Sequence, residues 1–158
     1  MKWSKSIAAL LAAAATAGCG TPTSQQQPST NKARKHVIVQ FTEATLHPSV
    51  ARVLPGGDVA WLNYSSGMDG TVVFPASIRQ AFACSELRPI FMKSAAGYQS
   101  IPVTGDMENV VLPCPLKPGE YEYKLQLFEA GTLMGAGSGS AQMDNPTSEM
   151  AGKIIVGE

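Results

Sequence analysis

Three cysteines carry most of the reactive chemistry that this 158-residue sequence offers. In an exported protein, where thiols become oxidised, Cys84 and Cys114 are expected to form a disulfide and to leave Cys19 unpaired. The bridge would close a loop of about thirty residues, which stabilises a fold by roughly 3 kcal/mol in the chain-entropy model. A redox-active pair and two thiolate metal ligands are the alternatives. Both are disfavoured, because the two cysteines lack CxxC spacing and a neighbouring His.

Cys19 points to a different chemistry, namely export and lipid attachment. Two lysines precede an apolar, small-residue run over residues 7–17, which is shorter than the roughly 20 residues of a transmembrane helix. The letters TAGC at residues 16–19 resemble the lipobox of bacterial lipoproteins, although Thr16 replaces the usual Leu, Val or Ile. Ordinary signal-peptidase cleavage after residues 15–17 is the alternative. Lipidation would account for the cysteine that has no disulfide partner, so we expect Cys19 to be the residue that carries the lipid anchor.

The chain divides into three segments. Residues 1–18 are predicted to be an export signal. Residues 19–35 contain no large apolar side chain and cannot offset their ordering entropy by burial, so they are expected to form a flexible tether. Residues 36–158 are predicted to form one domain on the periplasmic side of a bacterial envelope. The outer membrane is favoured, because Gly20 rather than Asp follows the anchor.

Charge narrows the choice of partners. Residues 36–158 contain seven basic and twelve acidic side chains, a formal charge of about −5. Nucleic acid is therefore an unsuitable partner, because binding it requires a basic surface. The expected partners are the membrane, through the lipid anchor, and a protein of the envelope.

Histidines and methionines are the remaining candidates for acid–base chemistry or a metal site. His36 and His47 are the only histidines, and no nucleophile motif accompanies either of them, so we do not expect an enzyme. Soft thioether ligands for Cu(I) form an alternative site. The candidates are Met68, Met134, Met143 and Met150.

Many short strands separated by Gly and Pro predict an all-β sandwich. The clearest strand covers residues 120–128, where Tyr and Leu alternate with Glu, Lys and Gln, so one face is expected in the core and one in water. Gly56 and Gly57 are expected to reverse the chain, and residues 130–150 to form a long loop. The other expected strands cover residues 36–42, 44–53 with an interruption at Pro48, 59–63, 71–74, 90–92, 110–112 and 153–156.

Three motifs, in this order, resemble those of the cupredoxin family. Residues 54–63 read LPGGDVAWLN, residues 118–123 read PGEYEY, and residues 150–156 read MAGKIIV. The family commonly shows Gly-Asp-x-Val-x-Trp-x-Asn, Pro-Gly-x-Tyr-x-Tyr and Met-x-Gly-x-Ile-x-Val at these places. The resemblance implies a Greek-key β-sandwich, here with a disulfide-stapled excursion between Cys84 and Cys114.

The resemblance also implies where a copper site would lie. A type 1 site uses two imidazoles, a thiolate and a weak axial Met. Gly70 and Leu125 stand in the neighbourhoods of the first His and of the Cys, and no His lies between Leu125 and Met150. Only Met150 of the expected ligands is present. The sequence therefore resembles a degenerate member without type 1 copper, and no cofactor is expected.

These expectations combine into one interpretation and one alternative. The interpretation is an envelope lipoprotein whose copper-free domain acts as a binding or structural module. The alternative is a periplasmic copper-binding or electron-transfer protein that uses the methionines instead of the family's ligands.

Overall fold

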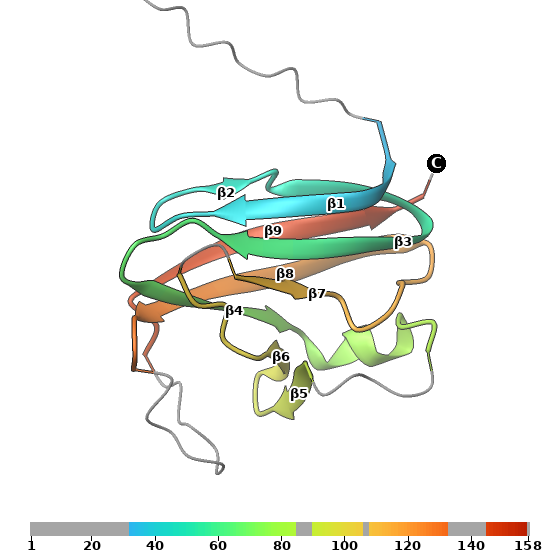
Figure 1. The fold of residues 1–158 in the computed structure, drawn as a ribbon. Helices are drawn as coiled ribbons and strands as arrows, with labels where there is room; N and C mark the ends of the chain where they lie inside the picture. The colour runs from blue at the N-terminus through green and yellow to red at the C-terminus, as the bar shows by residue number, and fades with distance from the viewer. Residues whose placement is uncertain (1–31, 85–89, 106–107, 133–144, 158) are drawn as a thin grey trace, which may run out of the picture.

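The computed structural model describes residues 32–84, 90–105, 108–132 and 145–157, which consist almost entirely of β-strands (Figure 1). One short 3-10 helix, η1 (Ala76–Gln80), interrupts them. The strands are β1 (Arg34–Phe41), β2 (Leu46–His47), β3 (Val50–Asn63), β4 (Met68–Phe74), β5 (Phe91–Ser94), β6 (Gly97–Ser100), β7 (Asn109–Val111), β8 (Gly119–Glu129) and β9 (Ser148–Val156).

Strand β3 takes part in both layers of the sandwich. Its second half pairs in parallel with β1 and antiparallel with β7. Its first half pairs in parallel with β9, and the hydrogen-bonded order then continues through β8, β4, β6 and β5. The layers face each other across an aromatic core, in which the Trp61 ring of β3 contacts Phe74 and Tyr123 edge-on, with centroid distances of 6.0 and 5.2 Å. The predicted all-β sandwich is confirmed.

Gly56 and Gly57 lie where the chain reverses its direction within β3, as expected (Figure 1). Before the two glycines the chain runs antiparallel to β1, with His47 opposite Gln40 and Val53 opposite Arg34, and after them residues 58–63 run parallel to β1. Gly56 has φ 75°, a conformation that glycine adopts without steric cost.

The ends of three predicted segments shift. β1 begins at Arg34, so the last two residues assigned to the tether belong to the first strand. β9 begins at Ser148, so the expected loop over residues 130–150 is shorter than predicted, because its end pairs with β8. The export signal and Cys19 lie outside the described residues.

Strand β8 shows the alternation expected from its sequence. Tyr123, Leu125 and Leu127 are at most 2% exposed, and Glu120, Glu122 and Lys124 face solvent. The described part of the chain contains no helix with the length and apolar character needed to cross a bilayer.

Candidate functional site

Gly70, in the neighbourhood expected for a first copper-binding His, lies within β4 under an aromatic ring. A Cβ atom on Gly70 would come within 2.6 Å of Phe41 Cζ and 3.4 Å of Leu127 Cδ2. Phe41 belongs to β1 in the facing layer and is fully buried. The space that a ligand side chain would need above Gly70 is therefore filled by Phe41.

Leu125, in the neighbourhood expected for the Cys ligand, is a core residue. It is fully buried, and its neighbours across the sheet are Val72 on β4 and Met150 on β9. The fold thus brings the expected positions onto three adjacent strands, as the resemblance implies. However, the only donor among Gly70, Leu125 and Met150 is the thioether of Met150, which is half-buried and packs against the core. These residues do not fit a type 1 copper site, which needs a thiolate and two imidazoles.

Two of the four methionines proposed for the alternative soft site, Met68 and Met150, lie apart on the sheet. Met150 lies opposite Leu125 of β8, and Met68 lies opposite Glu129, at a different level of the same strand. Both pack separately against the core. Met134 and Met143 lie outside the described residues.

The two histidines stand apart near the two ends of β1. His36 Nδ1 lies 3.2 Å from Asp58 Oδ2 on the surface, and His47 of β2 pairs with Gln40. Within the described ranges, no three His, Cys, Asp or Glu side chains come close enough to hold a metal ion.

A buried polar network, which sequence reasoning missed, holds the loop before β4. The Asn63 amide donates hydrogen bonds to the carbonyls of Met68 (2.9 Å) and Val103 (2.8 Å), and its oxygen accepts from the Ser65 backbone N–H at 2.8 Å. Asn63 is fully buried. The only sequence signal for this network was the place of Asn63 at the end of the Trp-x-Asn motif. The network makes Asn63 a structural residue.

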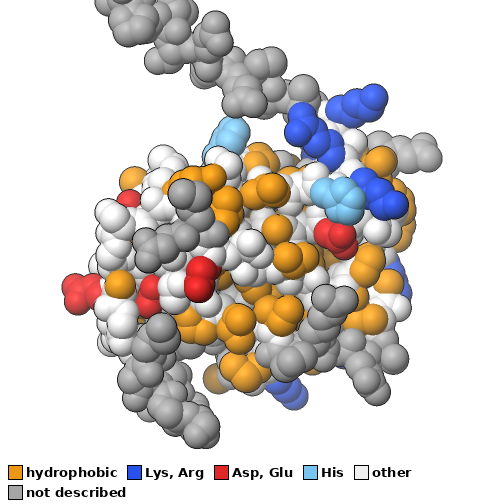
Figure 2. Space-filling model, in the orientation of Figure 1, with side chains coloured by type: hydrophobic (Ala, Val, Ile, Leu, Met, Phe, Trp, Pro, Cys, Tyr) orange, Lys and Arg blue, Asp and Glu red, His pale blue; other side chains and the backbone are white. Residues whose placement is uncertain are grey.

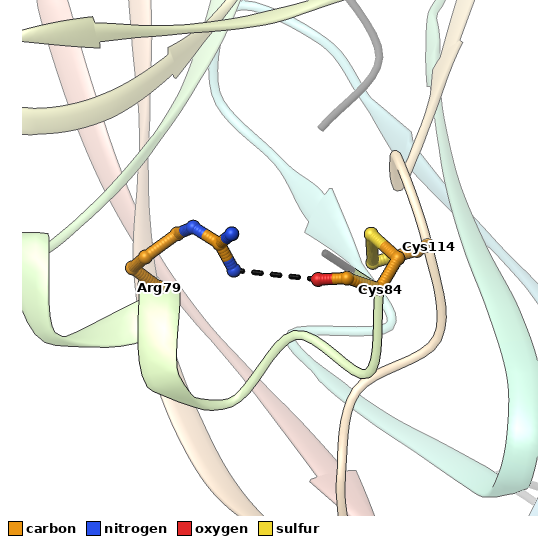
Figure 3. Close-up of a disulfide and its surroundings, with 3 residues drawn as sticks. All are labelled: Arg79, Cys84 and Cys114. Carbon is orange, nitrogen blue, oxygen red and sulfur yellow. Dashed lines mark hydrogen bonds between the residues drawn. A yellow bond between two sulfur atoms is a disulfide. The ribbon is translucent and has the colours of Figure 1, made fainter. Parts of the chain in front are cut away.

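The disulfide between Cys84 and Cys114 is present, with the two Cα atoms 6.1 Å apart. Figure 3 shows the Arg79 guanidinium pointing toward the Cys84 carbonyl, which it reaches at 3.4 Å. Two backbone bonds reinforce the bridge: Ala83 donates to the Pro115 carbonyl at 2.9 Å, and Lys117 donates to the Ala81 carbonyl at 2.8 Å. The chain after η1 is therefore fastened to the chain that leads into β8.

A groove of about 620 Å³ lies between these fastened segments. Helix η1 forms one wall and the first residues of β8 form the other. Ile78, Pro118 and Tyr121 contribute apolar surface. The Tyr121 hydroxyl donates a hydrogen bond to the Lys117 carbonyl at 2.8 Å, and partial burial raises the pKa of this phenol.

Charged side chains of both signs line the same groove. Lys153 Nζ lies 3.1 Å from Glu120 Oε2 and 4.0 Å from Glu122 Oε1, and Lys117 Nζ donates to the Gln80 carbonyl at 2.9 Å. The described lining residues include no His or Cys. This arrangement is suited to holding a ligand by apolar contact, hydrogen bonds and charge. Sequence reasoning missed the groove, because its walls come from segments about forty residues apart.

No family model matches the chain, and no curated protein matches it. Among solved structures, the chain is similar to a mutant amicyanin in its reduced Cu(I) form, at 16% identity over 80% of this chain and 87% of that chain, with a TM-score of 0.46. It is similar to reduced auracyanin from the photosynthetic bacterium Roseiflexus castenholzii, at 13% identity over 80% of this chain and 100% of that chain, with a TM-score of 0.43.

A third similar structure is the cysteine protease inhibitor EhICP2 from Entamoeba histolytica, at 12% identity over 78% of this chain and 99% of that chain, with a TM-score of 0.40. Amicyanin and auracyanin are cupredoxins, the family that the sequence motifs resemble.

Proposed function

We propose that the chain is a copper-free cupredoxin-like module that binds a partner protein in the bacterial envelope. The packing of Phe41 on Gly70 supports the copper-free part of this proposal. A ligand side chain at that position would have to displace a fully buried ring, and the neighbouring Leu125 is itself part of the core. Phe41 and Leu125 both belong to the apolar core, so the proposal expects the domain to fold without copper.

Copper loading of the purified full chain tests the proposal. Cu(II) should produce no intense thiolate-to-copper absorption band. The melting temperature should be the same with and without copper, because a ligand that binds the native state raises it by mass action. A blue band would overturn the proposal. A copper-dependent rise in melting temperature that disappears in Met150→Leu would instead support the methionine-based copper protein.

The groove between η1 and β8 is the surface that we assign to the partner. It is preshaped by a covalent bridge, so little ordering entropy is lost when a ligand fills it. A photo-crosslinking residue at Ser77 should form a discrete protein adduct in intact cells. The same residue at Met92, which is 58% exposed on β5, is the control and should not form that adduct. Equal adducts at both positions would count against the groove.

Attachment to the membrane through Cys19 is part of the same proposal. It is motivated by the lipobox-like TAGC at residues 16–19 and by the pairing of the other two cysteines, which leaves Cys19 over. Cys19→Ser should move the protein from the membrane fraction to the soluble fraction. Unchanged membrane fractionation after signal processing would contradict a lipid anchor.

A further inference from the structure

The outer face of β1, β3 and β7 has an exposed apolar centre. Ile38 of β1 pairs with Ala60 of β3, and Ala60 pairs with Val111 of β7, so the three side chains form one row across the layer. Ile38 is 56% exposed and Val111 is 36% exposed. The alternating residue Val39 is fully buried, which sets Ile38 on the outward side of the strand.

This row differs from what a solvated sheet face normally carries. The outer face of an antiparallel or mixed layer is usually polar, and a contiguous apolar patch bordered by polar side chains commonly marks an interface. The next row continues the patch with Leu62, which is half-buried, between Gln40 and Asn109. Figure 2 shows hydrophobic side chains gathered across the middle of the face in view.

Charges of opposite sign lie at the two ends of this face. Arg34 and Lys35 stand at the beginning of β1, and Glu43 follows its end. Glu108 also lies at the second end, because its carbonyl accepts a hydrogen bond from Asn63, the last residue of β3. Figure 2 shows most Lys and Arg side chains toward the upper right and most Asp and Glu side chains toward the left, with one acidic side chain beside a His on the right.

We propose that this face binds a second copy of the chain, with the strands of the two copies antiparallel. Two symmetric face-to-face arrangements are available. A two-fold axis along the strands would place Arg34 near its own copy, which is repulsive. A two-fold axis across the strands at Ile38 stacks Ile38 on Ile38. Arg34, four residues before Ile38, then lies over the region of Glu43, five residues after it. Charge complementarity favours this second arrangement.

The area of this face determines how strongly the two copies are expected to associate. β1 has 8 residues, β7 has 3, and residues 58–63 of β3 lie between them. With strands roughly 4.8 Å apart and about 3.3 Å per residue, the face covers on the order of 300 Å² in projection. Stable interfaces bury about 800 Å² per partner, so the dimer belongs to the weak, concentration-dependent class. Salt should weaken it further, because exposed charges are screened beyond about 10 Å at 0.1 M ionic strength.

Sedimentation velocity of the 158-residue chain carrying Cys19→Ser tests the proposal without a lipid anchor. The protein should form a dimer as its concentration rises, and less so at high salt. Ile38→Glu should weaken dimerisation at least tenfold. Met92→Glu is the matched control, because Met92 is 58% exposed on β5, and it should dimerise like the parent chain. Near-ultraviolet circular dichroism checks that both variants remain folded.

Charge reversal tests the antiparallel geometry. Arg34→Glu and Glu43→Arg should each weaken the dimer, and the double variant should restore it. A chain that stays monomeric at every concentration and salt level would overturn the proposal, as would equal effects of Ile38→Glu and Met92→Glu. If the monomer instead binds vesicles containing phosphatidylglycerol and Ile38→Glu abolishes that binding, the face belongs to a membrane and the dimer is refuted.

Discussion

The two ends of β8 lie in the same strand but in different surroundings. Around Leu125, β8 is flanked by β4 on one side and β9 on the other. At Glu120 and Glu122, the described pairing is to β9 alone, because β4 ends at Phe74 and the chain turns away through Pro75 into η1. The flanked end is closed and apolar, and the end with one partner borders the groove.

This difference explains where binding is possible in the domain. A strand with neighbours on both sides has no free edge, and a facing layer buries the side chains on its inner face, so those side chains contribute to stability. Where pairing stops on one side, Tyr121 and the charged residues beside it remain accessible. Changes at the closed end should therefore act on folding, and changes at the groove should act mainly on the surface.

The largest effect is expected at the closed end. Leu125→Ala removes a fully buried side chain and should lower the free energy of unfolding by roughly 2–5 kcal/mol, through lost burial and the cavity left behind. Urea denaturation measures this loss. Met92→Ala is the control, and a change of about 0.5 kcal/mol or less is expected at such an exposed position. A loss below about 1 kcal/mol for Leu125→Ala would mean that this end is not packed as described.

Removal of the disulfide should have the next largest effect and should act on the groove. The double change Cys84→Ala and Cys114→Ala releases a loop of 30 residues and should cost about 3 kcal/mol. Hydrogen exchange should accelerate at the Ala83 and Lys117 amides, which bond beside the bridge, more than at the Val72 amide of the closed end. Uniform acceleration across these amides would contradict a separately fastened groove.

Tyr123 lies between the two ends and makes stability sensitive to alkaline pH. Burial raises the pKa of this phenol to about 12, and the nearby Trp61 side chain offsets part of the rise. The two side chains approach closely but make no hydrogen bond of good geometry. The Tyr123 phenol of the folded state keeps its proton at pH values at which the same phenol of the unfolded state has lost it. The stabilisation is therefore complete below pH 10 and falls by about 2–3 kcal/mol as the pH rises to 12.

Denaturation at pH 9 and at pH 11.5 measures that loss. Tyr123→Phe should remove most of the difference between the two pH values. Tyr64→Phe, at a residue 46% exposed, is the control and should keep the difference. If both variants behave like the parent chain, another group causes the alkaline instability.

Gly70→Ala should have a smaller effect of about 1–3 kcal/mol, because the added methyl group overpacks the space under Phe41. Phe41→Leu opens that space and itself destabilises the core. In the double variant the two losses should be less than additive, since the residues are in contact. Additive losses in a double-mutant cycle would show that Phe41 does not cover Gly70.

The smallest effect is expected in the groove. Lys153→Gln removes the ion pairs with Glu120 and Glu122, which are largely exposed. Exposed pairs contribute roughly 0–1 kcal/mol, so the melting temperature should hardly change. A loss as large as that of Leu125→Ala would remove the distinction between the two ends of β8.

The local pattern of the sequence was enough for several features. Alternation over residues 120–128 predicted which face of β8 is buried, because side chains of a strand point alternately to its two sides. The cysteine count predicted the bridge between Cys84 and Cys114. The absence of His after His47 removed the imidazoles of a type 1 copper site before any fold was known.

Other features depend on contacts between distant segments. Phe41 of β1 packs over Gly70 of β4, and the groove lies between η1 and β8. Pairing partners and facing layers are set by burial over the whole chain. The tertiary structure therefore decided which end of β8 is closed and which end can bind.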